Sequence, residues 1–235
     1  MDTKVFYENE YLEKGLDAQR RYPNEELCRF MGRNYFNKNI GYEQRSKIRI
    51  LEIGCGSCAN LWMVAKEGFS AYGCDLSENA IDIGKKMLEK YNVDASLTAC
   101  NMFATPYEGN LFDAIIDIFS SNCLCRSDYI LLLKEIKRIL KPSGKFFSYF
   151  PSKRSDTFIR STLEDKYDED TLKGIFDNKS PYYGNNYLFR FMSHEDVNCL
   201  LSDAGFQIQY IETTGRTSSQ GNEYFEWIVF EAIRF

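Results

Sequence analysis

The segment ILEIGCGSCANLW, residues 50–62, contains two competing signals. Cys55 and Cys58 form a Cys-x-x-Cys pair, a spacing that occurs in redox and metal sites. Gly54 and Gly56 form a Gly-x-Gly pair, which lets a loop turn tightly and lets its backbone approach a ligand. The two interpretations lead to different proteins, so the surrounding sequence has to decide between them.

The remaining cysteines and the histidine do not form a metal-binding pattern. The chain contains 8 cysteines and one histidine, His194, which lies far from the opening segment. A zinc site needs about four ligands, usually from two paired clusters. Isolated thiols in short apolar stretches behave as small hydrophobes, as we expect for Cys74, Cys100 and Cys199. We therefore expect no metal site, and we interpret the two thiols of the opening segment as small loop residues.

Composition and charge limit the classes of partner. A chain of 235 residues with 44% hydrophobic content is long enough for one α/β domain with a substantial core. Its net charge of -5 gives no electrostatic basis for binding nucleic acid or an anionic membrane. No apolar run reaches the roughly 18 residues of a membrane span, and the first residues lack a signal-peptide pattern. We expect a cytoplasmic protein with reduced cysteines.

Strand-like and helix-like periodicities alternate after residue 48. The β-branched run 48–53 precedes a stretch in which Leu61, Val64 and Ala65 share one helical face. Further strands are predicted at 70–76, 94–100, 111–119 and 145–150. Further helices are predicted at 77–91, with Ser77 as the N-cap, and at 128–140, where KPSG ends the helix. This alternation predicts a parallel sheet that helices cover on both faces.

The glycine pair then joins the first strand to the first helix. A helix N-terminus offers unpaired N–H groups and a partial positive charge to a ligand. Asp75 ends the second strand about 20 residues later, where a carboxylate can accept both ribose hydroxyls of a nucleoside. Its alternative role is that of a turn residue beside Ser77. Gly54-x-Gly56-x-x-Ala59 also fits the dinucleotide fingerprint of nicotinamide dehydrogenases, a weak pattern by itself.

The ordered set of motifs resembles the class I S-adenosylmethionine-dependent methyltransferases. LEIGCGSC resembles their first motif, acid-x-Gly-x-Gly-x-Gly, with Glu52 as the acid, and YGCDLSENAI resembles the second. The region of strands three and four is resembled by NMFATPY followed by LFDAIIDIF. The segment that leads into strand five is resembled by LKPSGKFF. SHEDVNCLLSDAGFQIQYIE and FEWIVFEAIRF resemble the last helix, strand six and the terminal antiparallel strand. The resemblance covers residues 48–150 and 193–235.

This resemblance implies the fold, the cofactor and the reaction. The fold would be one methyltransferase domain over residues 1–235, a Rossmann-like, doubly wound seven-stranded sheet, mostly parallel with a terminal antiparallel strand and helices on both faces. S-adenosylmethionine would be the methyl donor and S-adenosylhomocysteine the product. Two departures, Cys58 for the third glycine and Asn101 for the acid after strand three, leave a non-catalytic nucleoside-binding protein with a degenerate fold as the alternative. A nicotinamide dehydrogenase is the third possibility.

The resemblance also implies roles for matching residues. The methionine part of the cofactor would be wrapped by Gly54, Cys55, Gly56 and Ser57, with Glu52 fixing the loop or the amino group. The ribose would bind Asp75, and the adenine would contact Leu76, Asn101 and Met102. The end of strand four would lie between cofactor and acceptor, through Asp117, Ile118 and Phe119. Ordinary core positions are the alternative for Leu76, Ile118 and Phe119.

A catalytic base is the least defined part of the site. Asp117 is the candidate, and a turn or cap acid is its alternative role. His194 is a weaker candidate because Ser193 and Asp196 have capping-box spacing, which places His194 in the first turn of a helix. The reaction needs alignment and water exclusion more than a base, because a sulfonium methyl is already activated.

Two additions to the core are expected to shape the acceptor site. DIFSSN follows strand four where amino-methyltransferases of DNA carry Asn/Asp-Pro-Pro-Tyr, so we expect a small-molecule acceptor, methylated at oxygen or nitrogen. The N-terminal addition 1–47 contains an amphipathic helix after Pro23 and Asn24. The insert 151–192 is rich in aromatic residues and is either a substrate lid or a packed structural segment. We expect both to roof the acceptor pocket, with its lining and candidate cations at Phe30, Tyr182, Tyr183, Arg190 and Arg33.

Overall fold

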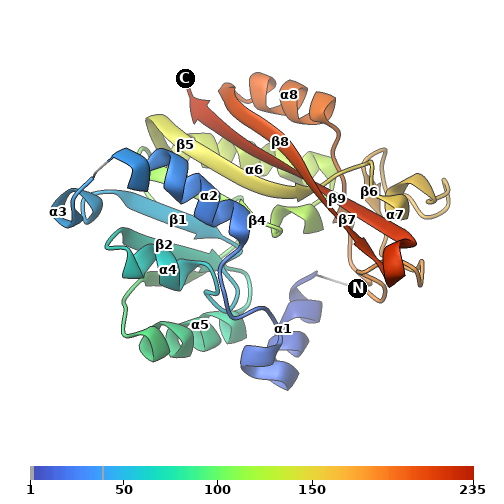
Figure 1. The fold of residues 1–235 in the computed structure, drawn as a ribbon, viewed down its shortest axis with the longest axis horizontal. Coiled ribbons are helices and arrows are strands. Elements are labelled where there is room, and N and C mark those ends of the chain that lie inside the picture. Colours follow the sequence, from blue (N-terminus) through green and yellow to red (C-terminus); the bar gives the residue numbers. More distant parts are fainter. Residues whose placement is uncertain (1–2, 39) are drawn as a thin grey trace.

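The computed structural model describes residues 3–38 and 40–235, and within them a seven-stranded sheet forms the centre of the molecule (Figure 1). The strand order is β3-β2-β1-β4-β5-β9-β8. Its strands are β1 (Arg49–Ile53), β2 (Ser70–Asp75), β3 (Ser96–Ala99), β4 (Phe112–Ile118), β5 (Leu140–Pro151), β8 (Phe206–Ser218) and β9 (Glu223–Arg234). Strands β1 to β5 pair in parallel, and β9 is antiparallel to both of its neighbours. This confirms the predicted doubly wound sheet with a terminal antiparallel strand.

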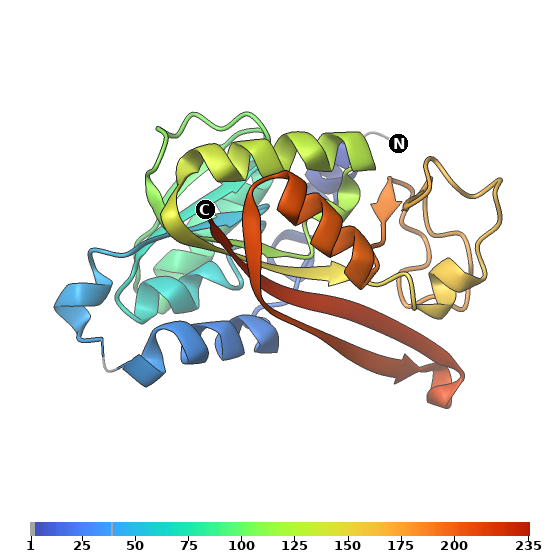
Figure 2. The same ribbon diagram turned by 90° about the horizontal axis from the view of Figure 1, so that it is seen from above.

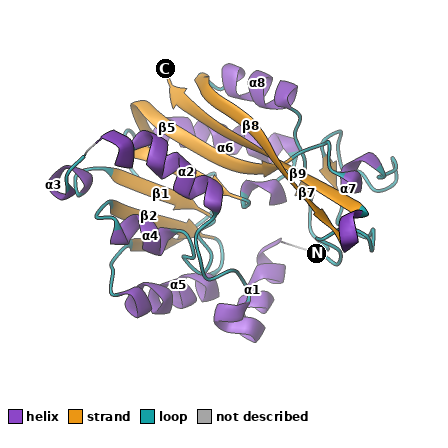
Figure 3. Ribbon diagram, viewed as in Figure 1, coloured by secondary structure: helices purple, strands orange, loops and turns teal. Residues whose placement is uncertain are grey.

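Helices cover both faces of the sheet (Figures 2 and 3). They are α1 (Thr3–Lys14), α2 (Glu25–Asn34), α3 (Tyr42–Arg45), α4 (Leu61–Lys66), α5 (Glu78–Tyr91), α6 (Arg126–Ile139), α7 (Asp156–Ile159) and α8 (His194–Asp203). Short 3-10 helices lie in the connections: η1 (Gly15–Asp17), η2 (Phe36–Lys38), η3 (Ser121–Cys123) and η4 (Ser219–Gly221). Apolar residues of α6 and α8 pack on one face, and those of α2, α4 and α5 pack on the other. None of the helices in these described residues is long and apolar enough to cross a membrane.

Local side-chain chemistry fixes where the helices begin. The Ser77 hydroxyl accepts the backbone N–H of Ala80 at 3.0 Å, which starts α5 as the sequence predicts. Ser193 and Asp196 form a reciprocal capping box at the start of α8. His194 is therefore an exposed residue of the first helical turn, the structural role expected from its neighbours.

Strand β5 is longer than predicted. The prediction placed a turn at KPSG and a strand at 145–150, whereas β5 begins at Leu140, directly after α6. Leu140 pairs with Phe112, and the ladder then shifts register before Lys145 pairs with Ala114. Turn residues in the sequence thus mark an irregularity within the strand.

The N-terminal addition and the insert occupy different places. Helix α2 begins at Glu25, directly after its N-cap Asn24, as predicted. It lies on the sheet face, where Phe30 stacks on Phe147 with ring centroids 4.7 Å apart. Helix α1 packs instead beside α5, with Tyr11 buried against it. The insert carries α7 and a small sheet of β6 (Thr171–Leu172) and β7 (Phe189–Arg190). In Figure 1 the arrowheads of β1, β2 and β5 point towards the side that holds α1 and the insert.

Candidate active site

A cavity of about 1120 Å³ lies at the carboxyl ends of the central strands. The loops after β1, β2, β3 and β4 line one side, and α1, the insert and β9 line the other. Open α/β sheets bind ligands at this edge, where the strand order reverses. Its volume exceeds the roughly 300–1,000 Å³ of typical ligand sites, so it has room for two small molecules. A smaller cavity of about 370 Å³ lies in the insert and contains none of the motif residues.

The glycine pair forms a tightly packed loop at the base of this cavity. Gly54 and Gly56 have φ of +62° and +49°, a region that favours glycine. A Cβ at Gly54 would lie 2.7 Å from the hydroxyl oxygen of Ser120. A Cβ at Gly56 would lie 2.5 Å from the hydroxyl oxygen of Tyr11, on α1. Both glycines are therefore required by the backbone geometry and by the packing around the loop.

The two cysteines of the segment are buried, free thiols. A hydrogen bond with Cys58 and burial raise the pKa of Cys55, whereas a reactive thiol needs a lowered pKa. The Cys58 sulfur covers Gly84 of α5, where a Cβ would lie 2.7 Å away. Residues 3–38 and 40–235 contain no group of three or more potential metal-ligating side chains. This geometry matches the interpretation of the thiols as small loop residues.

Glu52 presents an unsatisfied carboxylate oxygen beside the glycine loop. Its side chain lines the cavity but is 2% exposed, and Asn60 donates a hydrogen bond to Oε1 at 2.6 Å. The second oxygen, Oε2, is buried with no hydrogen-bond partner in the described residues. Burial raises the pKa of Glu52 to about 8, although the Asn60 hydrogen bond and the charge of Arg20 oppose this shift. A buried acceptor without a partner suits a ligand that brings a donor, such as an ammonium group.

Asp75 links the glycine loop to the start of α5. Its Oδ2 accepts the N–H of Gly56 at 2.8 Å, and its Oδ1 accepts the N–H of Ser77 at 2.9 Å. Burial raises the pKa of Asp75, and these backbone hydrogen bonds oppose the rise. The carboxylate lines the cavity, so the turn role and a ligand-binding role are geometrically compatible.

The other residues expected around an adenine also reach the cavity. Its lining includes Leu76, Asn101 and Met102, with Leu76 37% exposed rather than buried in the core. The Asn101 side-chain oxygen accepts the N–H of Phe103 at 3.1 Å, which holds the loop after β3. Cys55, Ile118 and Phe119 line the same cavity. The residues predicted for the cofactor are thus brought together, except Gly56 and Ser57, which are buried and do not line the cavity.

Asp117 does not face the cavity, which argues against the predicted role as a base. It is fully buried, and its carboxylate accepts hydrogen bonds from the hydroxyls of Ser120 (2.7 Å), Ser148 (3.0 Å) and Ser121. The backbone N–H groups of Ser120 and Ser121 donate to it as well. A carboxylate saturated by five donors anchors the loop after β4, the alternative role that the sequence allowed.

Three residues expected in the acceptor pocket lie elsewhere. Phe30 covers the sheet on Phe147, because an amphipathic stripe indicates a buried face without indicating its partner. Arg190 is fully buried, with its guanidinium 3.8 Å from the centroid of the Tyr129 ring. Arg33 forms an ion pair with Glu231 at 2.6 Å. Neither arginine lines the cavity, so neither cation faces an acceptor.

The insert does bring its aromatic residues to the cavity. Both Tyr182 and Tyr183 line it, and Tyr182 packs on Phe119 with ring centroids 5.0 Å apart. Opposite them, Tyr7 of α1 forms a hydrogen bond of 2.9 Å with the hydroxyl of Tyr187. The roof therefore consists of α1 and the insert, and not of α2 as the sequence analysis expected.

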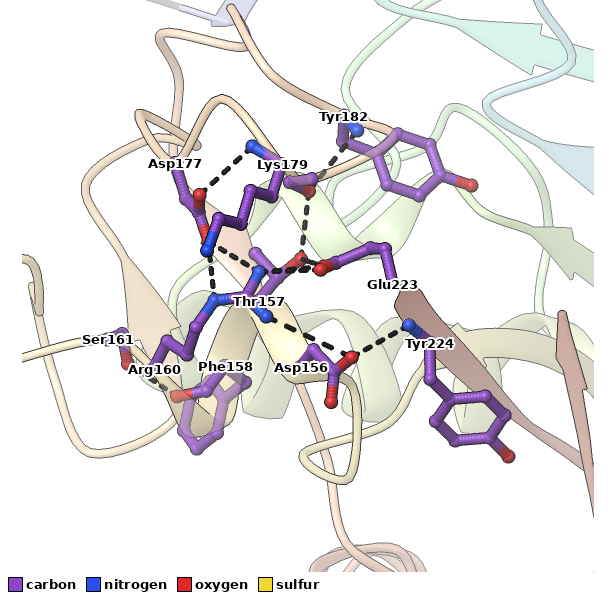
Figure 4. Close-up of polar contacts among 11 residues, drawn as sticks. Asp156, Thr157, Phe158, Arg160, Ser161, Asp177, Lys179, Tyr182, Glu223 and Tyr224 are labelled. Carbon is purple, nitrogen blue, oxygen red and sulfur yellow. Dashed lines mark hydrogen bonds and ion pairs between the residues drawn. The ribbon is translucent and has the colours of Figure 1, made fainter. Parts of the chain in front are cut away.

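Polar contacts attach the insert to the end of β9 (Figure 4). Arg160 forms ion pairs of 2.8 Å with Glu223 and also pairs with Asp177. The Thr157 hydroxyl donates a hydrogen bond of 2.8 Å to the Ser180 hydroxyl. The Ser180 hydroxyl oxygen also accepts a hydrogen bond from the backbone N–H of Tyr182 at 3.3 Å. This network ties Tyr182 to the strand that forms the far wall of the cavity.

Several residues that line the cavity were not expected from the sequence. They are Phe6, Tyr7, Tyr11, Arg20, Tyr149, Arg216 and Trp227. The spacing of Tyr7 and Tyr11, i and i+4, was the available signal for a second N-terminal helix. The others come from distant segments, and only the folded sheet brings them together.

The chain is similar to known methyltransferases. Residues 50–144 match the family model described as a methyltransferase domain. A demethylmenaquinone methyltransferase of Bacillus mycoides (strain KBAB4) is 33% identical over 103 residues, 41% of this chain and 42% of the relative. A sterol 4-C-methyltransferase of Caenorhabditis elegans is 28% identical over 116 residues, 48% of this chain and 34% of the relative. The chain therefore spans less than half the length of these curated relatives.

Solved structures share the fold across most of the chain. A methyltransferase from Methanosarcina mazei, described as S-adenosylmethionine-dependent, has a TM-score of 0.68 at 19% identity, covering 86% of this chain and 97% of that one. Magnesium protoporphyrin IX methyltransferase from Synechocystis PCC 6803, with bound S-adenosylhomocysteine, has a TM-score of 0.66 at 14% identity, covering 100% of both chains. Residues 50–144 therefore match a methyltransferase domain, and the chain as a whole has the fold of these methyltransferases.

Proposed function

We propose that this protein transfers a methyl group from S-adenosylmethionine to oxygen or nitrogen of a small-molecule acceptor. One observation carries the proposal: a single cavity of about 1120 Å³ has the glycine loop and the unpaired Oε2 of Glu52 at one end and an aromatic wall at the other. A cofactor and an acceptor therefore fit side by side. One curated relative is named for transfer to carbon, so a carbon acceptor is the alternative.

The residues at the polar end fit the cofactor. Its methionine part carries an ammonium and a carboxylate, which complement the free oxygen of Glu52 and the guanidinium of Arg20. Asp75 would accept the ribose hydroxyls, while Leu76 and Asn101 would contact the adenine. The tight glycine loop lets the backbone approach without a side chain between them.

The cofactor supplies a methyl group that its positive sulfur already activates. The protein contributes alignment of the acceptor and exclusion of water. The hydrogen bond between Tyr7 and Tyr187 closes the roof over the cavity, so the insert acts as a lid. Burial raises the pKa of Tyr7 well above its usual value, and burial raises that of Tyr182 to about 12, so neither phenol serves as a base at neutral pH.

Calorimetry with S-adenosylhomocysteine tests the cofactor half of this proposal. Wild-type protein should bind S-adenosylhomocysteine and should not bind nicotinamide cofactors. Asp75→Ala should weaken binding at least tenfold, because each lost charged hydrogen bond contributes about 1.5–3 kcal/mol. Asp82→Ala, an exposed change on α5, is the matched control and should leave affinity unchanged. Equal affinity in Asp75→Ala with an intact fold would contradict the ribose role.

A non-catalytic binding protein is the second candidate. Cys58 adopts φ of +60° at the position where the family motif has glycine, and Asn101 replaces an acid. Both departures favour a site that holds a nucleoside without turnover. Production of S-adenosylhomocysteine from S-adenosylmethionine with a panel of metabolites would exclude this candidate, and binding without product would favour it.

A further inference from the structure

The end of the cavity away from Asp75 has a wall of aromatic rings. Tyr149 of β5 and Trp227 of β9 stack with centroids 5.5 Å apart and an interplanar angle of 17°. Four strand spacings separate β2 from β9 in the sheet order, a distance of about 19 Å. A nucleoside bound over β2 therefore does not reach Tyr149 and Trp227, and a second molecule can bind there. Flat, stacked rings favour a flat aromatic partner.

The aromatic wall also contains a polar atom without a well-formed hydrogen bond. The side chain of Trp227 is 7% exposed, and its indole N–H has no hydrogen-bond partner in the described residues. Burial raises the pKa of the Tyr182 phenol, and a side-chain contact in which the Trp227 N–H acts as donor opposes the rise. This contact falls short of full hydrogen-bond geometry, so the N–H remains open to a better acceptor. An indole N–H only donates, so its ligand partner must be an acceptor.

A cation lies on the same face of the sheet as Trp227. Arg216 of β8 lines the cavity, and no residue of the described segments forms an ion pair with it. In the β8–β9 ladder Arg216 pairs with Phe225, two residues from Trp227, so the side chains of Arg216 and Trp227 are diagonal neighbours on one face. The charge of Arg216 contributes to lowering the pKa of Glu25, after the hydrogen bond and charge of Arg29. The Glu25 carboxylate, however, forms its ion pair with Arg29 at 2.7 Å, not with Arg216.

We propose that the acceptor is a flat aromatic molecule that carries a carboxylate. Its ring lies along Tyr149 and Trp227, and its carboxylate accepts hydrogen bonds from the Arg216 guanidinium and the Trp227 N–H. The planar guanidinium matches a carboxylate with two parallel donors. A neutral apolar acceptor would leave the buried N–H unpaired, which is unfavourable. This inference rests on the proposed methyltransferase function and specifies its acceptor class.

Two ligands of the same shape, one charged and one neutral, test whether the site recognises the carboxylate. Calorimetry would compare 6-hydroxy-2-naphthoate with 6-hydroxy-2-naphthamide on full-length protein saturated with S-adenosylhomocysteine. The acid should bind at least tenfold more tightly than the amide, because a charged hydrogen bond is lost in the amide. Arg216→Gln should remove this preference while leaving the affinities for the amide and for S-adenosylhomocysteine unchanged. Trp227→Phe keeps the ring and should weaken acid binding several-fold.

Arg154→Gln is the matched control. Its side chain is 79% exposed, approaches Glu226 at 3.8 Å and does not line the cavity. This variant should keep the full preference for the acid. An unchanged preference in Arg216→Gln, equal binding of acid and amide to wild-type protein, or binding of neither would overturn the inference.

Two further measurements distinguish failure of the carboxylate assignment from failure of the proposed function. Tighter binding of 2-naphthyl phosphate than of the acid would overturn the assignment to a carboxylate in favour of a phosphate. If wild-type protein fails to bind S-adenosylhomocysteine, the proposed function fails. The acid–amide comparison without cofactor then still shows whether Arg216 and Trp227 recognise the anion.

Discussion

The two ends of the cavity are built in different ways. The cofactor end comes from short motifs, in which Glu52, Gly54 and Gly56 lie within five residues and Asp75 follows at the end of the next strand. The acceptor end joins Tyr7, Tyr149, Tyr187, Arg216 and Trp227, which are spread over most of the chain. One end is therefore a local property of the sequence, and the other exists only in the folded molecule.

Asp117 lies between the two ends and should produce the largest effect when it is changed. Asp117→Ala leaves the buried hydroxyls of Ser121 and Ser148 and the backbone N–H of Ser121 without their acceptor. Each unsatisfied buried group costs about 1–3 kcal/mol, so we expect a loss of about 3 kcal/mol or more in the free energy of unfolding. Urea denaturation measures it, and Ser148→Ala, which removes one donor, should lose about 1 kcal/mol. Equal losses in both variants would contradict the anchoring role.

Changes in the insert, which covers the cavity, should affect acceptor turnover more than cofactor affinity. Replacing Tyr182 and Tyr183 with alanine removes part of the acceptor wall, including the ring packed on Phe119, but leaves Asp75 and Asn101 unchanged. We expect kcat/KM for the acceptor to fall by about 100-fold, the effect of a misplaced reactant, while the Kd of S-adenosylhomocysteine stays the same. Parallel kinetics and calorimetry distinguish these outcomes. A matching loss of cofactor affinity would show that the two ends are not separate.

Glu52 gives the cofactor end a pH dependence of stability. Burial raises the pKa of its carboxyl to about 8, against an ordinary value of 4.5 in the unfolded chain. Between these values the folded state binds more protons than the unfolded state, so stability is highest below 4.5 and is lost as pH rises towards 8. The slope from this group is at most about 1.4 kcal/mol per pH unit.

Glu52→Gln isolates this contribution, because the amide keeps the shape of the side chain and does not titrate. The free energy of unfolding from urea denaturation at pH 5.5, 7 and 8.5 should fall less steeply in the variant than in the wild type. Identical slopes would show that Glu52 does not titrate in this range. Binding of S-adenosylhomocysteine should tighten with rising pH in the wild type only, since the charged carboxylate attracts the ligand's ammonium.

The same difference between local and distant residues explains how much could be predicted. Strands β1 to β5 follow from apolar runs and caps such as Ser77, because these signals act within a few residues. The amphipathic stripe of α2 identified Phe30 as buried, but a stripe does not say which surface buries it. In α1 the signal is only the pair Tyr7 and Tyr11, which is weaker than the stripe of α2. Arg216 carries no local signal, because its importance depends on its neighbours in β9.

The smallest effect concerns the cysteines of the opening segment. Cys58 holds φ of +60°, which costs a residue with a side chain roughly 1–2 kcal/mol, and glycine would relieve this strain. Against this, Cys58→Gly removes a buried thiol that covers Gly84, a loss of about 1 kcal/mol. The two terms nearly cancel, so we expect the free energy of unfolding to change by less than about 1 kcal/mol, with S-adenosylhomocysteine affinity kept or improved.

Cys55→Gly is the matched control for this prediction. Cys55 is also a buried thiol in the same loop, but its φ is not in the left-handed region. The variant therefore loses packing against Gly73 and gains chain flexibility, with no strain to relieve. Urea denaturation should show Cys55→Gly to be less stable than Cys58→Gly by about 1–2 kcal/mol. If both variants lose the same stability, Cys58 is unstrained, and the family's third glycine serves ligand contact and not the conformation of the loop.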